Sequence, residues 1–185
     1  MDIEVSLWFS EHHDKVLNIF FSLLSLLGEG MFIWIILLLI VLYNKKEWFY
    51  LKIIPFMCIG GWLIVDLLIK NLVRRERPYV QLNLEAIGYL IPHSYSFPSG
   101  HSFSSFLAAT ILTYLKPKYS ILFYLLAFLI ALSRVYCLVH FTSDVIVGAI
   151  LGILWGLLTI LIMKKVFQKE LWYNNLAKRG KENVK

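Results

Sequence analysis

Long apolar runs constrain this chain more than any other feature of its sequence. The first run, VLNIFFSLLSLLGEGMFIWIILLLIVLY at 16–43, is interrupted only by a GEG triplet, and four more follow at about 51–70, 99–115, 119–136 and 145–163. A helix needs about 20 mostly apolar residues to cross a bilayer core. The chain is 59% hydrophobic and has a mean hydropathy of +0.70. We therefore expect an all-α transmembrane helical bundle.

The number of spans depends on how the first run is interpreted. Splitting it at GEG would give six spans, but each half is then too short to cross, so we expect five. The runs at 99–115 and 119–136 are also short, and their polar ends are expected to line a cavity. Residues 1–15 alternate apolar and acidic side chains, which predicts an interfacial helix. They lack the basic region of a cleavable signal peptide.

The distribution of lysine and arginine predicts the orientation. The connection at 44–52, the turn at 116–118 and the segment 164–185 are all basic and lie on one side of a five-span bundle. This side is expected to be cytoplasmic. The chain is thus divided into an interfacial helix, a bundle at 16–163 with an outer loop at 71–98, and a basic cytoplasmic tail at 164–185. We interpret the net charge of +6 as membrane orientation, with the tail on anionic lipids, and not as nucleic-acid binding.

Several basic residues oppose this trend. The same topology places them on the outer side, which suggests an anionic ligand: Lys70, Arg74, Arg75, Arg77 and Arg134. They belong to three polar clusters that the topology brings to one depth, KNLVRRERP at 70–78, PSGH at 98–101 and SRVYCLVHFTSD at 133–144.

The PSGH cluster and the cations are suited to a phosphate. Ser99 begins a predicted helix, where free N–H groups and the helix dipole bind anions, and Gly100 permits close approach of the backbone. Lys70, Arg77 and Arg134 can surround a tetrahedral dianion.

Two histidines and an aspartate add the chemistry of phosphoryl transfer. His140 and Asp144 are four residues apart, so the carboxylate can hold one imidazole nitrogen and leave the other free to attack. His101 is available as a general acid. Together with the cations, these residues predict transfer through a phosphohistidine, without a metal or another cofactor.

The three clusters resemble the signature Lys-x6-Arg-Pro, Pro-Ser-Gly-His, Ser-Arg-x5-His-x3-Asp of the type 2 phosphatidic acid phosphatase family. The resemblance covers 70–144 and implies a bacterial integral-membrane lipid phosphatase. It implies that His140 is the nucleophile, Asp144 its orienting partner and His101 the acid for the leaving group. It also implies phosphate binding by Lys70, Arg77, Ser99, Gly100 and Arg134.

Other polar residues have more than one interpretation. Asp66 lies one turn before Lys70 and is expected to pair with it. Arg74 and Arg75 are either loop charges or contacts to a second phosphate or an acidic headgroup. Glu29 is either a residue of a substrate portal or a locally bonded break in the helix. Gly148, Gly152 and Gly156 predict close helix packing, which we expect within the bundle, with homodimerisation as the alternative.

We expect the protein to remove the terminal phosphate from a membrane lipid at the outer leaflet of a bacterial cytoplasmic membrane. The sequence leaves open undecaprenyl pyrophosphate, phosphatidylglycerolphosphate, phosphatidic acid and lipid A 1-phosphate, and the oligomeric state. The alternatives are a phosphatase for soluble esters, a non-catalytic carrier or binder of phosphorylated lipids, and a vanadate-dependent oxidation enzyme.

Overall fold

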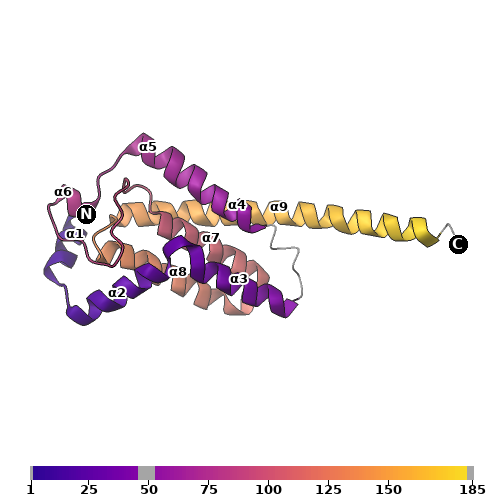
Figure 1. Cartoon of the computed structure of the whole chain (residues 1–185), viewed down its shortest axis with the longest axis horizontal. Coiled ribbons are helices and arrows are strands. Elements are labelled where there is room, and N and C mark those ends of the chain that lie inside the picture. The colour runs from indigo at the N-terminus through magenta and orange to yellow at the C-terminus, as the bar shows by residue number, and fades with distance from the viewer. Residues whose placement is uncertain (1, 46–52, 183–185) are drawn as a thin grey trace.

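The computed structural model describes residues 2–45 and 53–182, which form helices and no strand (Figure 1). This confirms the all-α prediction. The helices are α1 (Asp2–Glu11), α2 (Lys15–Leu27), η1 (Glu29–Met31), α3 (Phe32–Lys45), α4 (Ile53–Gly60), η3 (Gly61–Ile69), α5 (Lys70–Val73), α6 (Pro78–Gln81), α7 (Gly100–Leu115), η4 (Pro117–Tyr119), α8 (Ser120–Tyr136) and α9 (Thr142–Glu182).

Two helical segments within the described ranges are long and apolar enough to cross a membrane, Pro117–Tyr136 and Thr142–Val166. A third is obtained if Lys15–Leu27 and Glu29–Tyr43, which meet at a bend of 55°, are counted as one span. The bend is at the GEG triplet, where Gly30 has the left-handed φ of 57° that glycine adopts without strain. Apolar runs thus became helices close to the predicted bounds, while the count of five spans stays a prediction.

Helix α9 extends from the predicted fifth span through most of the predicted tail. It is continuous from Thr142 to Glu182 and projects beyond the rest of the bundle (Figure 1). Lys46 and Lys52, which belong to the predicted cytoplasmic cations, lie outside the described residues, as do 183–185. The position of this end relative to a membrane stays a prediction.

A glycine stripe brings α7 and α9 into close contact. A Cβ atom added at Gly148 would lie 2.6 Å from the Ser99 carbonyl oxygen, and one at Gly152 would lie 2.3 Å from that of Phe103. One at Gly156 would lie 2.9 Å from Thr110 Cβ. The structure therefore confirms that this stripe packs inside the bundle. It also fixes the start of α7 against the start of α9, where the polar clusters lie.

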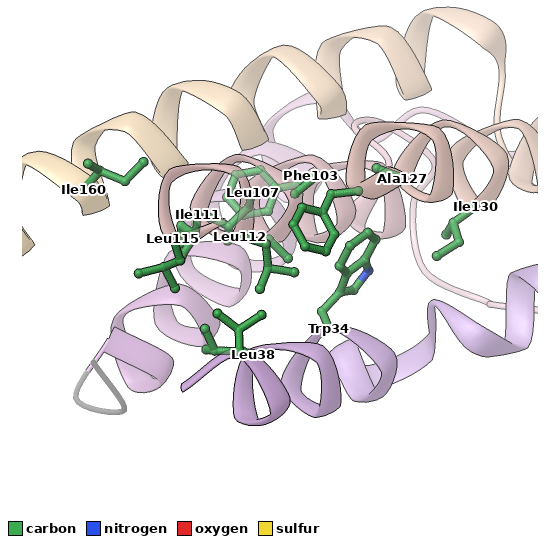
Figure 2. Close-up of a cluster of buried hydrophobic side chains, with 14 of the residues drawn as sticks. Trp34, Leu38, Phe103, Leu107, Ile111, Leu112, Leu115, Ala127, Ile130 and Ile160 are labelled. Atoms are coloured by element: carbon green, nitrogen blue, oxygen red, sulfur yellow. The ribbon is translucent and has the colours of Figure 1, made fainter. Parts of the chain in front are cut away.

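The hydrophobic core lies among α3, α7, α8 and α9 (Figure 2). Trp34 is 1% exposed, and its indole N–H donates to Ser105 Oγ at 3.1 Å, which satisfies the buried polar atom of the ring. Figure 2 shows this core around α7, with Trp34, Leu38, Phe103, Leu107, Ile111, Leu112, Leu115, Ala127, Ile130 and Ile160 labelled. The packed helices thus provide a rigid support for the polar end of the bundle.

Candidate active site

The predicted site residues converge at the end of the bundle where α5 ends and α7 and α9 begin. A cavity of about 650 Å³ lies there. Among its lining residues are six of the eight that the sequence singled out: Lys70, Arg77, Gly100, His101, Arg134 and His140. The other two, Ser99 and Asp144, are fully buried beside the cavity and are not among the described residues that line it.

His140 lies in the turn just before α9, with its two ring nitrogens in different surroundings. Nε2 is 3.2 Å from Arg77 Nη1, and because a guanidinium only donates, Nε2 acts as the acceptor and the ring proton is on Nδ1. Burial holds the pKa of His140 well below its ordinary value, so the ring is neutral at neutral pH. A neutral imidazole with a lone pair on Nε2, the nitrogen near the cavity cation Arg77, has the protonation state of a nucleophile.

Asp144 lies in the first turn of α9, behind the imidazole. Its Oδ2 is 3.6 Å from His140 Nδ1, longer than a direct hydrogen bond. Ser96 completes the connection, because its hydroxyl donates to Asp144 Oδ2 and lies 3.4 Å from Nδ1. The Phe141 N–H also donates to Oδ2 at 2.9 Å. The sequence did not single out Ser96, which no motif or spacing distinguishes from the other serines of the loop.

Arg77 lies at the N-terminus of α6 and is held from several sides. Its guanidinium donates to the carbonyl oxygens of Ser94, Tyr95 and Val139 at 2.6, 3.2 and 2.7 Å. Burial, together with the charge of Arg134, lowers the pKa of Arg77 to about 10. The group therefore remains charged at neutral pH, and its orientation is fixed before any anion binds.

Arg134 and Lys70 supply two further positive charges. Arg134 lies in the last turn of α8 and is 2% exposed, and its Nη1 donates to Ser25 Oγ of α2. Its buried Nε has no hydrogen-bond partner among the described residues and is available to an anion. Lys70 Nζ lies 2.5 Å from Asp66 Oδ1, which confirms the predicted pair.

The first residue of α7, Gly100, lines the cavity. Ser99 is the N-cap of this helix, because the hydroxyl accepts from the Ser102 N–H at 3.3 Å. The Ser99 N–H donates to the Asp144 carbonyl oxygen at 3.0 Å and so ties α7 to α9. A Cβ at Gly100 would meet only Val65 within 4 Å, at 3.9 Å, so a ligand can approach the backbone here.

Glu29, whose role the sequence left open, borders the same cavity. Its Oε2 lies 3.2 Å from His101 Nε2. The bend at GEG makes this contact possible, because Gly28 packs so closely that an added Cβ would lie 2.5 Å from Ile130 Cγ2 and 3.0 Å from the His101 ring. Each of the two cavity histidines therefore has a carboxylate next to it.

Arg75 is not an unpaired loop charge, because its guanidinium contacts two carboxylates. Its Nη1 donates to Asp144 Oδ1 at 2.6 Å, and its Nη2 donates to Asp2 Oδ2 at 2.9 Å. It is thus paired behind Asp144, and it does not belong to the lining of the cavity as described. Arg74 instead donates to the Asn71 carbonyl oxygen of its own helix at 3.0 Å.

Comparison with known sequences points to one family. The family model described as PAP2 superfamily matches residues 49–168, which include all three polar clusters. The chain is similar to phosphatidylglycerophosphatase B of Bacillus subtilis, at 29% identity over 71% of this chain and 62% of that protein. It is also similar to lipid A 1-phosphatase of Porphyromonas gingivalis, at 39% identity over 48% of this chain and 21% of that protein. A third relative is undecaprenyl-diphosphatase of Sulfolobus acidocaldarius, at 35% identity over 51% and 50% of the two chains. The chain therefore spans less than two thirds of the length of each of these three relatives.

Two crystal structures resemble the fold over most of the chain. The first transmembrane PAP2 type phosphatidylglycerolphosphate phosphatase from Bacillus subtilis has a TM-score of 0.71 and 26% identity, covering 89% of this chain and 85% of that one. Aquifex aeolicus LpxE has a TM-score of 0.69 and 28% identity, covering 86% and 94%. The helical architecture is thus shared with a transmembrane phosphatase, and the chain is membrane-embedded.

Proposed function

This chain belongs to the PAP2 superfamily, and we propose that it is a lipid phosphatase that removes the terminal phosphate from a membrane lipid phosphate or pyrophosphate. The observation that carries the proposal is the cavity that gathers His101, His140 and three cationic side chains at one end of a membrane-embedded bundle. The three named relatives act on different lipids, but each name describes removal of phosphate from a lipid. We therefore propose the reaction class and leave the lipid tail and headgroup open.

In the proposed mechanism the phosphate binds among Lys70, Arg77, Arg134 and the backbone at Gly100. These groups neutralise the charge of the dianion and of the transition state, so the chemistry needs no metal. Nε2 of His140 attacks phosphorus, and the N–P bond forms as the P–O bond to the lipid breaks. The Nδ1 proton stays on the ring, directed at Ser96 and Asp144.

His101 completes the two half-reactions. In the first it gives a proton to the departing oxygen of the lipid. In the second it takes a proton from the water that attacks the phosphohistidine; the new O–P bond forms as the N–P bond breaks, and inorganic phosphate and free His140 are released. His101 and His140 line the same cavity, as two groups that act on one phosphate must. Glu29 Oε2 lies 3.2 Å from His101 Nε2, close enough to hold the ring in position.

We further propose that this chemistry takes place at the outer leaflet of a bacterial cytoplasmic membrane. The proposal depends on the basic residues at 44–52, 116–118 and 164–185, which the positive-inside rule assigns to the cytoplasm. The site is at the opposite end of α7, α8 and α9 from the turn at 116–118. The basic segment from 164 onward is then free to contact anionic cytoplasmic lipids.

The test is phosphate release by the purified protein from the four candidate lipids side by side. We expect turnover of at least one lipid, its abolition in His140→Ala, and a large but incomplete loss in Asp144→Asn. Brief incubation with phosphate-labelled substrate should leave acid-labile label on the wild-type chain and none on His140→Ala. A His140→Ala variant with activity near the wild type would refute the phosphohistidine. A wild-type chain that binds the lipids without releasing phosphate would indicate the carrier instead.

A further inference from the structure

A network of charges lies on the side of Asp144 opposite His140. Arg75, in the segment between α5 and α6, connects Asp144 of α9 with Asp2 of α1. Its Nη1 is shared between Asp144 Oδ1 at 2.6 Å and Ser143 Oγ at 2.7 Å, and its Nη2 donates to Asp2 at 2.9 Å. The guanidinium carbon also lies 4.0 Å from the centroid of the Phe141 ring. Arg75 is therefore fixed in both position and orientation.

Asp2 of α1 belongs to the same network and contacts both Arg75 and Ser143. It accepts from the Ser143 N–H at 3.1 Å and from the Ser143 hydroxyl, and so satisfies a backbone donor in the first turn of α9. Burial by itself raises the pKa of Asp2, but the hydrogen bonds from Ser143 and Arg75 outweigh it and lower the pKa below its ordinary value. Asp2 is therefore a carboxylate at neutral pH, and it attaches α1 to the start of α9.

The arrangement determines which oxygen of Asp144 faces the histidine. Arg75 holds Oδ1, while Oδ2 receives Ser96 and the Phe141 N–H and lies toward His140. An arginine next to Asp144 alone would weaken the attraction between that carboxylate and the imidazolium that forms during the reaction. Asp2 compensates part of the arginine charge, so the charges alternate from Asp2 through Arg75 and Asp144 to His140.

We propose that Arg75 is a positioning residue for the nucleophile, anchored by Asp2 of α1, and that it acts through Asp144 without touching the substrate. The inference depends on the proposed function, since it assigns His140 as the nucleophile. It gives α1 a task beyond contact with a membrane interface, because the first helix of the chain holds the charge that orients Asp144.

The experiment compares Arg75→Ala, Arg75→Lys and Arg74→Ala in the purified full chain. Arg74 is the matched control, because it is the neighbouring arginine and the hydrogen bond described for its side chain goes to the Asn71 carbonyl oxygen, away from Asp144. Losing the charged hydrogen bonds to Asp144 should lower kcat of Arg75→Ala by about 10- to 100-fold. KM and inhibition by vanadate should stay within about twofold, as expected for a loss confined to the chemical step. Arg75→Lys should recover part of kcat, and Arg74→Ala should match the wild type.

Added guanidinium separates positioning from folding. Arg75 has 28% of its side chain exposed, so the space left in Arg75→Ala is open to a small cation. Millimolar guanidinium should restore part of kcat in Arg75→Ala and leave Arg74→Ala unchanged. If Arg75→Ala does not fold, Asp2→Asn replaces it, with a smaller loss of kcat expected at unchanged KM.

Three outcomes would overturn the inference. An unchanged kcat in Arg75→Ala, or in Asp2→Asn where that variant replaces it, would show that Asp144 needs no such support. A rise in KM or weaker vanadate inhibition as large as the fall in kcat would place Arg75 on the substrate. If Arg75→Ala folds but added guanidinium does not restore its kcat, the role of Arg75 is structural alone. An inactive wild-type chain would instead refute the proposed function, so the two failures are distinguishable.

Discussion

An added methyl group should have different effects at two glycines of the bundle, lowering stability at one and activity at the other. At Gly152 of α9 a Cβ would lie 2.3 Å from the Phe103 carbonyl oxygen and 3.0 Å from its carbonyl carbon. This is about 1 Å shorter than an ordinary carbon–oxygen contact. The obstacle is backbone, which cannot rotate away, so α7 and α9 must separate. At Gly100 the nearest atom is Val65 Cγ1 at 3.9 Å, and the residue borders the cavity.

Gly152→Ala should therefore destabilise the fold by about 1–3 kcal/mol, the usual cost of overpacking. For a chain of this size, this predicts a Tm lower by roughly 2–12 °C. Gly100→Ala should keep the wild-type Tm and instead lower kcat/KM by about tenfold or more, because the methyl group displaces the phosphate. Thermal unfolding in detergent and phosphate release measure the two effects. An unchanged Tm in Gly152→Ala, or an equal fall in Gly100→Ala, would contradict the packing argument.

Two further predictions concern the cations and the orientation. If side chains neutralise the phosphate, EDTA should leave the rate unchanged and vanadate should inhibit, whereas strict dependence on added magnesium would count against the cationic site. In a cysteine-free background, cysteine at Glu85 should react with an impermeant thiol reagent in intact cells and cysteine at Ser120 should not. The reverse labelling pattern would place the site in the cytoplasm.

Much of this architecture could be predicted because it depends on local pattern. The apolar runs set the helices, and the glycine spacing on one face of α9 indicated close helix packing, for which the structure supplies α7 as the partner. The pair of Asp66 and Lys70 follows from their spacing on one helix.

The parts that escaped prediction depend on contacts across the chain. Arg75 meets Asp2 across 73 positions, and no periodicity links an arginine in a loop to an aspartate in the first helix. Ser96 reaches Asp144 across 48 positions from an irregular segment. The contact of Glu29 with His101 needs the 55° bend, whose direction a GEG triplet does not specify. All three residues support the predicted site residues, whose chemistry alone was visible in the sequence.

The role of His101 can be tested by changing the leaving group. A lipid alcohol leaves poorly as an alkoxide, so a phosphate monoester such as phosphatidic acid needs a proton in the transition state. A polyprenyl diphosphate expels a lipid monophosphate, whose second pKa is near 6, as for other phosphate monoesters, and which needs little assistance. Loss of a general acid typically costs about 10²–10⁴-fold in rate. The cost of removing His101 should therefore depend on the substrate.

His101→Ala should slow monoester cleavage by an amount in that range and diphosphate cleavage markedly less, whereas His140→Ala should slow both alike. Glu29→Gln keeps the size of the side chain 3.2 Å from His101 but removes its charge, so it should show the same substrate dependence more weakly. Rates of the three variants on one monoester and one diphosphate lipid decide the matter. Equal losses for His101→Ala on both substrates would mean that His101 binds phosphate and does not protonate the leaving group. Glu29 would then have no part in proton transfer, and its role would be confined to the structure of the bend.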